Sequence, residues 1–212
     1  MYKLTRPRIR AFLEKYKTTE LVLDVGSGGA DQHVLFPSRT TIDVDPARNP
    51  EIVGDAQEMP FADATYSTIL CTEVLEHIPD PQKAVDEMYR VLKPGGTLIL
   101  TTRFLFPVHD APGDYWRFTP YGLQALFSKW DVLEQEVEAD AFYTIAVLLQ
   151  RIAFQADLRG GKVTKGLLLC LAFVLSRMDW LLLKRYGDIG RTDIVPVLMS
   201  SGVYIACRKP LS

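Results

Sequence analysis

Short apolar runs alternate with polar or helical segments from Leu21 to about Val137, and this pattern sets the predicted fold. Four runs are predicted to be buried strands, and a fifth is a weaker candidate: 21–25, 40–44, 67–71, 97–102 and the weaker 51–53. Runs that are apolar at consecutive positions are typical of parallel strands covered by helices on both faces. The alternation of strand, turn and helix therefore predicts a doubly wound α/β sheet.

One helix of this pattern can be placed together with its ends. Residues 81–92 carry apolar side chains at helical spacing, and these share one face: Ala84, Val85, Met88 and Leu92. Asp80 is the predicted N-cap. Pro94-Gly95-Gly96 is expected to stop the helix before the next strand.

Residues 141–187 differ from the rest because they are apolar with a helical period. The stripe consists of Leu167, Leu168, Leu171, Val174, Leu175, Met178, Leu181 and Leu182. A membrane span usually takes ~20 apolar residues, and each central charge costs roughly 2.5–3.5 kcal/mol, so Arg177 and Asp179 disfavour one. We expect a helical insertion that packs on the sheet or forms a lid or dimer face. A helix lying in the membrane interface is the second choice.

The insertion separates the last two strand candidates, 132–137 and 202–207. The predicted organisation is a single domain over 1–212, with a core at about 20–138 and 200–209 and a helical insertion at about 141–187. The chain has 212 residues, of which 48% are hydrophobic and 24% are charged; this is typical of a globular protein with a hydrophobic core. The formal net charge of −2 gives no support for nucleic-acid binding.

The cysteines and the N-terminus bear on the compartment. Three cysteines lie far apart and form neither a disulfide framework nor a metal motif, which favours a reducing environment. The first twenty residues lack the apolar core of a signal peptide. We expect a cytoplasmic protein and leave open a peripheral contact with a membrane.

The clearest candidate for a binding site is a glycine-rich turn directly after the first strand. Gly26 and Gly28 lack Cβ atoms, so they permit a tight turn and a close approach of the backbone to a ligand. The dehydrogenase pattern GxGxxG is not met because Asp31 stands at its third glycine. Asp43, at the end of the second strand, can accept hydrogen bonds from a ribose diol. Asp55, after the third, can accept from an adenine amino group.

Five motifs then follow one another in a familiar order: Asp24-Val-Gly-Ser-Gly-Gly, Ile42-Asp43-Val-Asp-Pro46, Gly54-Asp55-Ala, Glu73-Val-Leu-Glu-His77 and Leu92-Lys-Pro-Gly-Gly96. Together they resemble the motif series of class I S-adenosylmethionine-dependent methyltransferases, in particular the ubiquinone/menaquinone type. The resemblance implies a Rossmann-like sheet that is mostly parallel and has a C-terminal antiparallel strand. It also implies S-adenosyl-L-methionine as cofactor, with S-adenosyl-L-homocysteine as product.

The resemblance assigns cofactor residues one by one. Asp24, Gly26, Ser27 and Gly28 are expected at the methionine end, Asp43 and Val44 at the ribose, Asp55 and Ala56 beside the adenine, and Glu73 after the fourth strand. Two features depart from the usual pattern. The third glycine of GxGxG is Ala30, and only 19 positions separate Asp24 from Asp43, so the first helix is expected to be short.

Glu73, Glu76 and His77 follow the fourth strand, where related enzymes face cofactor and acceptor. A similar set holds magnesium in some subfamilies, and oxygen ligands suit that ion. Helix capping and a surface histidine explain the same residues, so we predict no metal. His77 is kept as a catalytic candidate.

A second polar cluster, residues 103–120, follows the fifth strand, and its density of functional side chains is unusual for a connector. It resembles a subgroup with an H-x-x-P-x-D-Y-x-R-x-T stretch. We expect His109 to be a general base or to orient the acceptor, and Tyr115 or Arg117 to bind a polar acceptor. The alternative is structural: Arg117 pairs with Asp114, the aromatic residues pack on the sheet, and Thr119 caps the following helix.

The leading hypothesis is methyl transfer to a small or amphipathic acceptor, linked to a lipid or glycan in one version. An alternative from another class is a non-catalytic cofactor-binding subunit whose helical block docks a partner. An NAD-dependent oxidoreductase is disfavoured by Asp31, and the acidic balance does not favour an RNA methyltransferase. A homodimer stays open.

Overall fold

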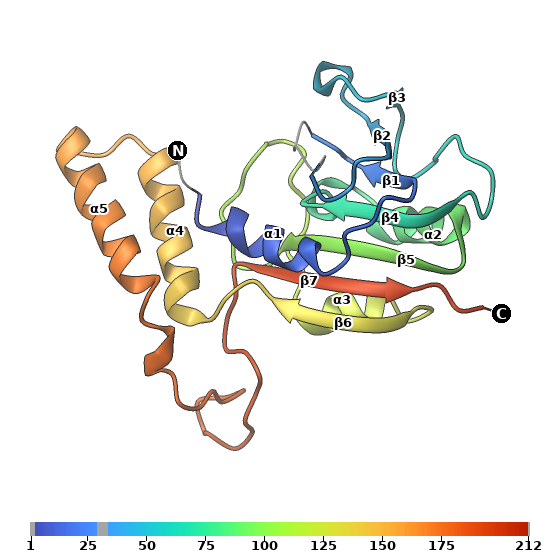
Figure 1. The fold of residues 1–212 in the computed structure, drawn as a ribbon. Helices are drawn as coiled ribbons and strands as arrows, with labels where there is room; N and C mark the ends of the chain where they lie inside the picture. Colours follow the sequence, from blue (N-terminus) through green and yellow to red (C-terminus); the bar gives the residue numbers. More distant parts are fainter. Residues whose placement is uncertain (1–2, 29–33, 212) are drawn as a thin grey trace.

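The computed structural model describes residues 3–28 and 34–211 and contains a seven-stranded sheet (Figure 1). The strands are β1 (Val22–Val25), β2 (Arg39–Asp43), β3 (Ile52–Val53), β4 (Tyr66–Thr72), β5 (Leu92–Arg103), β6 (Asp131–Val137) and β7 (Gly202–Arg208). Their order is β3-β2-β1-β4-β5-β7-β6, and only β7 runs antiparallel to its neighbours. The predicted fold class, with its antiparallel last strand, is confirmed.

The strand order reverses next to β1, and this places the site. β1 pairs with β2 on one side and with β4 on the other, so Val25 lies level with both Ile42 and Cys71. The loops that leave β1, β2 and β4 therefore emerge together at the carboxyl edge. Such a switch point is where open α/β sheets bind their ligands.

Helices cover both faces of the sheet. α1 (Thr5–Glu14) packs on one face, and α2 (Pro81–Val91) and α3 (Pro120–Leu126) pack on the other (Figure 1). Alternation along β5 serves both layers: Leu98 and Leu100 join the core under α2 and α3, whereas Ile99 joins the core under α1. This is the two-sided burial that its unbroken apolar run predicts.

The helix expected at residues 81–92 is present, and its cap is confirmed. The Asp80 carboxylate accepts a hydrogen bond from the Lys83 backbone N–H, 3.1 Å away. The expectation for Pro94-Gly95-Gly96 is wrong, because β5 begins at Leu92 and contains these residues. Leu92 already pairs with Tyr66 of β4, and the Gly95 N–H donates to the carbonyl of Lys209, so the segment is held as strand.

The connection between β1 and β2 is short. Among its described residues, 26–28 and 34–38, there are turns and bends but no helix. Leu35 and Phe36 are buried in the core under α1. The expectations for Gly29, Ala30 and Asp31 lie outside the described residues.

The helical block before β7 is a hairpin of α4 (Ala141–Gln155) and α5 (Gly161–Leu175), followed by the short η3 (Asp179–Leu181). It lies beyond the carboxyl ends of the parallel strands (Figure 1). The predicted stripe is broken, since α5 ends at Leu175 and buries only Ala172. In the described part of the chain, none of the helices combines the length and the apolar character that crossing a membrane requires.

Candidate functional site

A pocket of about 750 Å³ opens at the carboxyl edge of the sheet. One end is formed by the turn after β1 and the loops after β2 and β3, the middle by the loops after β4 and β5, and the far end by cationic side chains. In this order the principal lining residues are Gly26, Ser27, Gly28, Asp43, Val44, Asp55, Ala56, Glu73, His77, His109, Arg103, Arg6, Lys3 and Arg151, and Asp110 adds one carboxylate near Arg151.

The turn after β1 requires its glycines. Gly26 has φ +66° and Gly28 has φ +49°, both in the left-handed region. A Cβ atom on Gly26 would lie only 2.4 Å from Cγ2 of Val74. Among the described residues, the nearest atom to a Cβ added at Gly28 is 3.4 Å away, so the constraint there comes from φ rather than from crowding.

Asp43 ties the ends of the first two strands together. One carboxylate oxygen accepts from the Gly28 N–H at 3.1 Å, and the other accepts from the Asp45 N–H at 3.0 Å. Carboxylate oxygens accept more than one hydrogen bond, so both keep capacity for a ligand diol. Asp55, at the neighbouring strand end, is similarly fixed by the Gln57 N–H at 2.8 Å. A bare glycine turn beside two fixed carboxylates fits an adenosine-containing ligand.

Asp24, which the resemblance assigns to the methionine end, lies beneath the turn, and its role at the cofactor stays a prediction. Its side chain is buried and forms an ion pair with Arg39 (Oδ2 to Nη1, 2.7 Å), and it does not line the pocket. Burial raises the pKa of Asp24 to about 6, although Arg39 acts in the opposite direction. Asp24 therefore braces β1 against β2 beneath the turn.

Glu73 follows β4 in a strained conformation, with φ +59°. Its carboxylate forms an ion pair with Arg103 and accepts a hydrogen bond from Thr101 Oγ1 at 3.0 Å. Non-glycine residues in this region are uncommon and cluster at functional sites. Glu73 lines the pocket, but much of its accepting capacity is used inside the protein.

Arg103 is buried between two carboxylates. Besides Glu73 it pairs with Glu138 (Nη1 to Oε2, 3.1 Å), which also accepts from Tyr204 Oη at 2.7 Å. Burial lowers the pKa of Arg103 and raises that of Tyr204. The guanidinium stacks on the Phe106 ring, 4.3 Å from its centre. This network fixes the end of β5 at the pocket.

Arg151 of α4 reaches the same aromatic ring. Its guanidinium lies 4.4 Å from the centre of the Phe106 ring. Burial and the neighbouring charges of Arg103 and Arg6 lower the pKa of Arg151. Among the residues that the structure describes, no carboxylate forms an ion pair with it. Sequence reasoning missed Arg151, although it is the one charged residue in the apolar segment 141–155.

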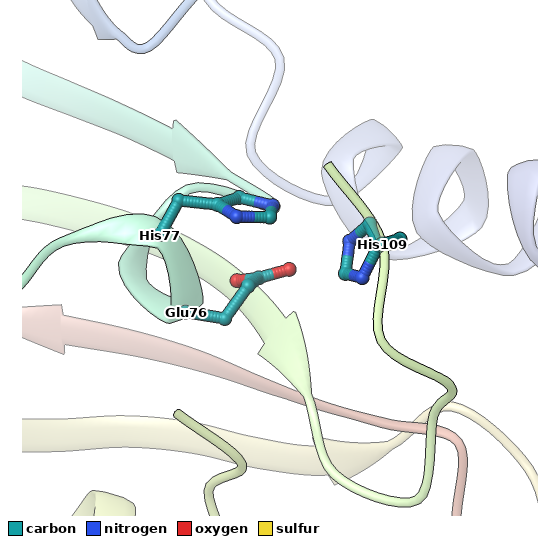
Figure 2. Close-up of side chains that lie close together, drawn as sticks. All are labelled: Glu76, His77 and His109. Carbon is teal, nitrogen blue, oxygen red and sulfur yellow. The ribbon is translucent and has the colours of Figure 1, made fainter. Parts of the chain in front are cut away.

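His77 and His109 line the pocket, and the buried Glu76 lies beside them (Figure 2). Burial raises the pKa of Glu76 and lowers that of His109. The imidazole centres of His77 and His109 lie 4.7 Å apart. Both histidines that the sequence places at the reactive centre therefore line the pocket, and their catalytic roles stay predictions.

Tyr115 and Arg117 do not line the pocket. Arg117 instead forms a two-pronged ion pair with Asp114, at 2.6 and 2.7 Å, which lowers the pKa of that carboxyl far below its usual range. Thr119 Oγ1 accepts from the Gly122 N–H at 3.0 Å and caps α3. The Arg117–Asp114 pair, the buried Phe118 and the Thr119 cap match the structural alternative, but Trp116 is exposed. Acceptor binding by Tyr115 and Arg117 stays a prediction.

Comparison with known proteins bears on this geometry. Residues 23–100 match the model of a family described as a methyltransferase domain. This part of the chain is therefore similar to a methyltransferase domain, in agreement with the class I S-adenosylmethionine-dependent series that the motifs resemble. This confirms the resemblance drawn from the motif order, and S-adenosylmethionine is the cofactor of the family.

Curated relatives match only part of this chain. A ubiquinone/menaquinone biosynthesis C-methyltransferase of Haemophilus ducreyi is 35% identical over 86 residues, which are 37% of this chain and 33% of that protein. A demethylmenaquinone methyltransferase of Paenarthrobacter aurescens is 32% identical over 126 residues, 52% of this chain and 48% of the relative. The chain thus spans about a third to a half of the length of these relatives.

Among solved structures, the [4+2]-cyclase SpnF superposes with a TM-score of 0.59 at 18% identity, over 99% of this chain and 80% of the cyclase. At this identity the likeness shows the fold alone. The methyltransferase fold therefore fixes the scaffold, and the reaction has to be argued from the site.

Proposed function

We propose that this chain transfers the methyl group of S-adenosylmethionine to an acceptor that carries an anionic group. The observation that carries the proposal is the pocket itself, which joins a nucleoside-binding end to a cationic end. Gly28 and Asp43 form the first end, and Arg151, without a carboxylate partner among the described residues, stands at the second. A half-buried guanidinium of this kind suits a carboxylate or phosphate.

The protein's part in the reaction is placement. When bound, S-adenosylmethionine supplies an activated methyl group for an in-line displacement, so the protein mainly aligns donor and acceptor. Asp43 would hold the ribose, Asp55 and Ala56 the adenine, and the turn from Gly26 to Gly28 the methionine end.

His109 and His77 stand between the two ends and are our candidates to accept the proton of a hydroxyl acceptor. The backbone N–H of His109 donates to Oδ2 of Asp114 at 2.8 Å, and Nδ1 of the His109 ring lies 3.4 Å from the same oxygen. Arg117 in turn forms an ion pair with Asp114. Arg117 would therefore act as a positioning residue rather than touch the acceptor.

The acceptor side of the pocket adjoins an apolar surface. The outer face of α5 exposes Leu167, Leu171 and Val174, and Lys162 and Arg177 lie near its two ends. An apolar face flanked by cations suits the interface of an anionic membrane. Because α4 carries Arg151 and packs against α5, a lipid-linked acceptor could reach the pocket along this hairpin. An amphipathic acceptor and a peripheral membrane contact belong to the proposal for this reason.

Cofactor binding is tested by thermal unfolding with S-adenosylhomocysteine, with NADH as control. At 100 times the dissociation constant, linkage gives about 2.7 kcal/mol, which is roughly 5–10 °C for a chain of this length. Asp43→Asn places an amide group against one of the two backbone N–H donors and should weaken binding at least tenfold. A shift with NADH alone, or none with S-adenosylhomocysteine, would contradict the cofactor assignment.

The anionic end is tested by calorimetry of inorganic phosphate binding to the S-adenosylhomocysteine complex. Arg151→Gln should weaken phosphate binding about tenfold, as expected for loss of a charge-assisted contact. Arg159→Gln, an exposed arginine of the same hairpin, is the matched control and should leave binding unchanged. Equal phosphate affinity in all three proteins would refute the role of Arg151.

The exposed face of α5 also keeps the non-catalytic alternative open, since it is a surface on which a partner can dock. The two functions separate in a methyl-transfer assay with radiolabelled cofactor and a membrane extract. Incorporation of label into an extractable compound supports the enzyme. Tight cofactor binding without incorporation supports the subunit.

A further inference from the structure

Three side chains that could bind one ion converge beside the pocket (Figure 2). One ligand atom each from Glu76, His77 and His109 lies within 4.8 Å of the other two. Glu76 and His77 come from the loop after β4, and His109 comes from the loop after β5. Each loop is fixed by its own strand, so the convergence is a product of the fold.

The Glu76 carboxylate is only half satisfied. Its residue is fully buried, and Oε2 accepts from Thr102 Oγ1 at 2.8 Å. Oε1 has no hydrogen-bond partner among the residues that the structure describes. A buried acceptor without a partner costs ~1–3 kcal/mol, and more if it is charged. A carboxylate in this state favours a cation or a proton as the missing partner, and the two imidazoles lie close enough to share a cation with it.

Both imidazoles are preset as ligands. Nδ1 of His77 lies 2.6 Å from the carbonyl oxygen of Gly113, and Nδ1 of His109 lies 3.3 Å from that of Pro107 and 3.4 Å from Oδ2 of Asp114. These acceptors place the proton on Nδ1, which leaves the Nε2 lone pair free. Histidines that bind metals almost always donate their other N–H to a carbonyl or carboxylate in this way.

We propose that Glu76, His77 and His109 bind a divalent transition metal of the zinc class. Two imidazole nitrogens and one carboxylate oxygen are a set that Zn²⁺ and Fe²⁺ use in catalytic sites, with a position left open. Mg²⁺ prefers oxygen ligands, and the oxygen-rich set considered from the sequence is not available, because the Glu73 carboxylate pairs with Arg103. Zn–N bonds of ~2.0–2.1 Å bring ligand atoms to roughly 3.3 Å of one another, which small side-chain rotations achieve from 4.8 Å.

The open position of this metal faces the pocket, because His77 and His109 line it. An acceptor bound at the cationic end can place a donor atom there. In that case His109 is a metal ligand and not the base. The metal would then polarise the acceptor. The binding claim itself does not depend on the proposed methyl transfer.

The test is a titration of the chelator-treated full chain with Co²⁺, a spectroscopic substitute for zinc. The wild-type protein should bind one Co²⁺ per chain with a visible absorption band, and Zn²⁺ should displace it, whereas Mg²⁺ should not. Glu76→Gln keeps an oxygen acceptor for Thr102, and His109→Gln removes one imidazole. Each should weaken Co²⁺ binding at least tenfold. His33→Gln, the remaining histidine, and Cys170→Ser, the exposed thiol, are controls and should bind as the wild type does.

Unchanged Co²⁺ affinity in both site variants, or absence of the band in the wild type, would overturn the proposal, as would loss of binding in either control. If a variant fails to fold, the wild-type protein still decides: Zn²⁺ should shift the ring-proton resonances of two histidines, whereas Mg²⁺ should not. Stabilisation by S-adenosylhomocysteine, measured without metal, tests the proposed function separately.

Discussion

Gly26→Ala examines whether the turn after β1 is as constrained as its geometry indicates. A left-handed φ costs a residue with a Cβ atom about 1–2 kcal/mol. The new atom would also lie 2.4 and 2.6 Å from the two methyl carbons of Val74, a degree of overpacking that costs ~1–3 kcal/mol. The sum is a loss of about 2–5 kcal/mol in the free energy of unfolding, or roughly 4–20 °C in melting temperature.

Urea unfolding of four proteins separates the two contributions. Val74→Ala removes both methyl carbons, so the double variant should recover the contact energy and retain the backbone cost. A coupling energy of about 1–3 kcal/mol is expected between the two positions. A Gly26→Ala protein within 0.5 kcal/mol of wild type would refute the reasoning. Additive effects would show that the turn moves away from Val74 and that the backbone alone carries the cost.

Three further predictions concern the interior. Burial raises the pKa of Asp24 to about 6, so the folded chain retains a proton that the unfolded chain loses near pH 4. The free energy of unfolding should fall by up to about 3 kcal/mol as pH rises from 4 to 6, and Asp24→Asn should flatten that slope in urea titrations. Glu138→Gln should lower the free energy of unfolding by about 2–3 kcal/mol, measured by chemical denaturation. This is less than the ~3–5 kcal/mol of an uncompensated buried charge, because Arg103 keeps its ion pair with Glu73. A loss under 1 kcal/mol would contradict the network. Of the three cysteines only Cys170 is exposed, so mass spectrometry should find one thiol alkylated in the native chain and three after unfolding.

The sheet could be predicted because its strands are buried on both faces. A run such as Leu98-Ile99-Leu100 is apolar at every position, and the structure buries alternate residues under different helices. The Asp80 cap could likewise be predicted, because capping is an interaction between residues close in sequence. The start of β5 at Leu92 was not, because Pro and Gly usually interrupt a strand, and pairing with β4 and β7 overrides that preference here.

Local motifs located one end of the pocket but not its full composition. Gly26, Gly28, Asp43 and Asp55 each follow a strand, and parallel strands bring their carboxyl ends together. Arg151 lies 108 positions after Asp43 and reaches the pocket only through the packing of α4. Nothing in its neighbourhood of the sequence indicates that approach, apart from a single charge within an apolar helix.

The loop after β4 connects the two ends of the pocket. Glu73 contacts Arg103 at the cationic end, and Val74 closes over Gly26 at the nucleoside end. Glu76 reaches Thr102 of β5, and its backbone carbonyl accepts from the N–H groups of the 115–116 segment. A displacement of this loop would therefore move the glycine turn, the histidine pair and Arg103 together. This explains the strained φ of Glu73: several independent contacts over-determine the backbone there, which is the condition under which such strain persists.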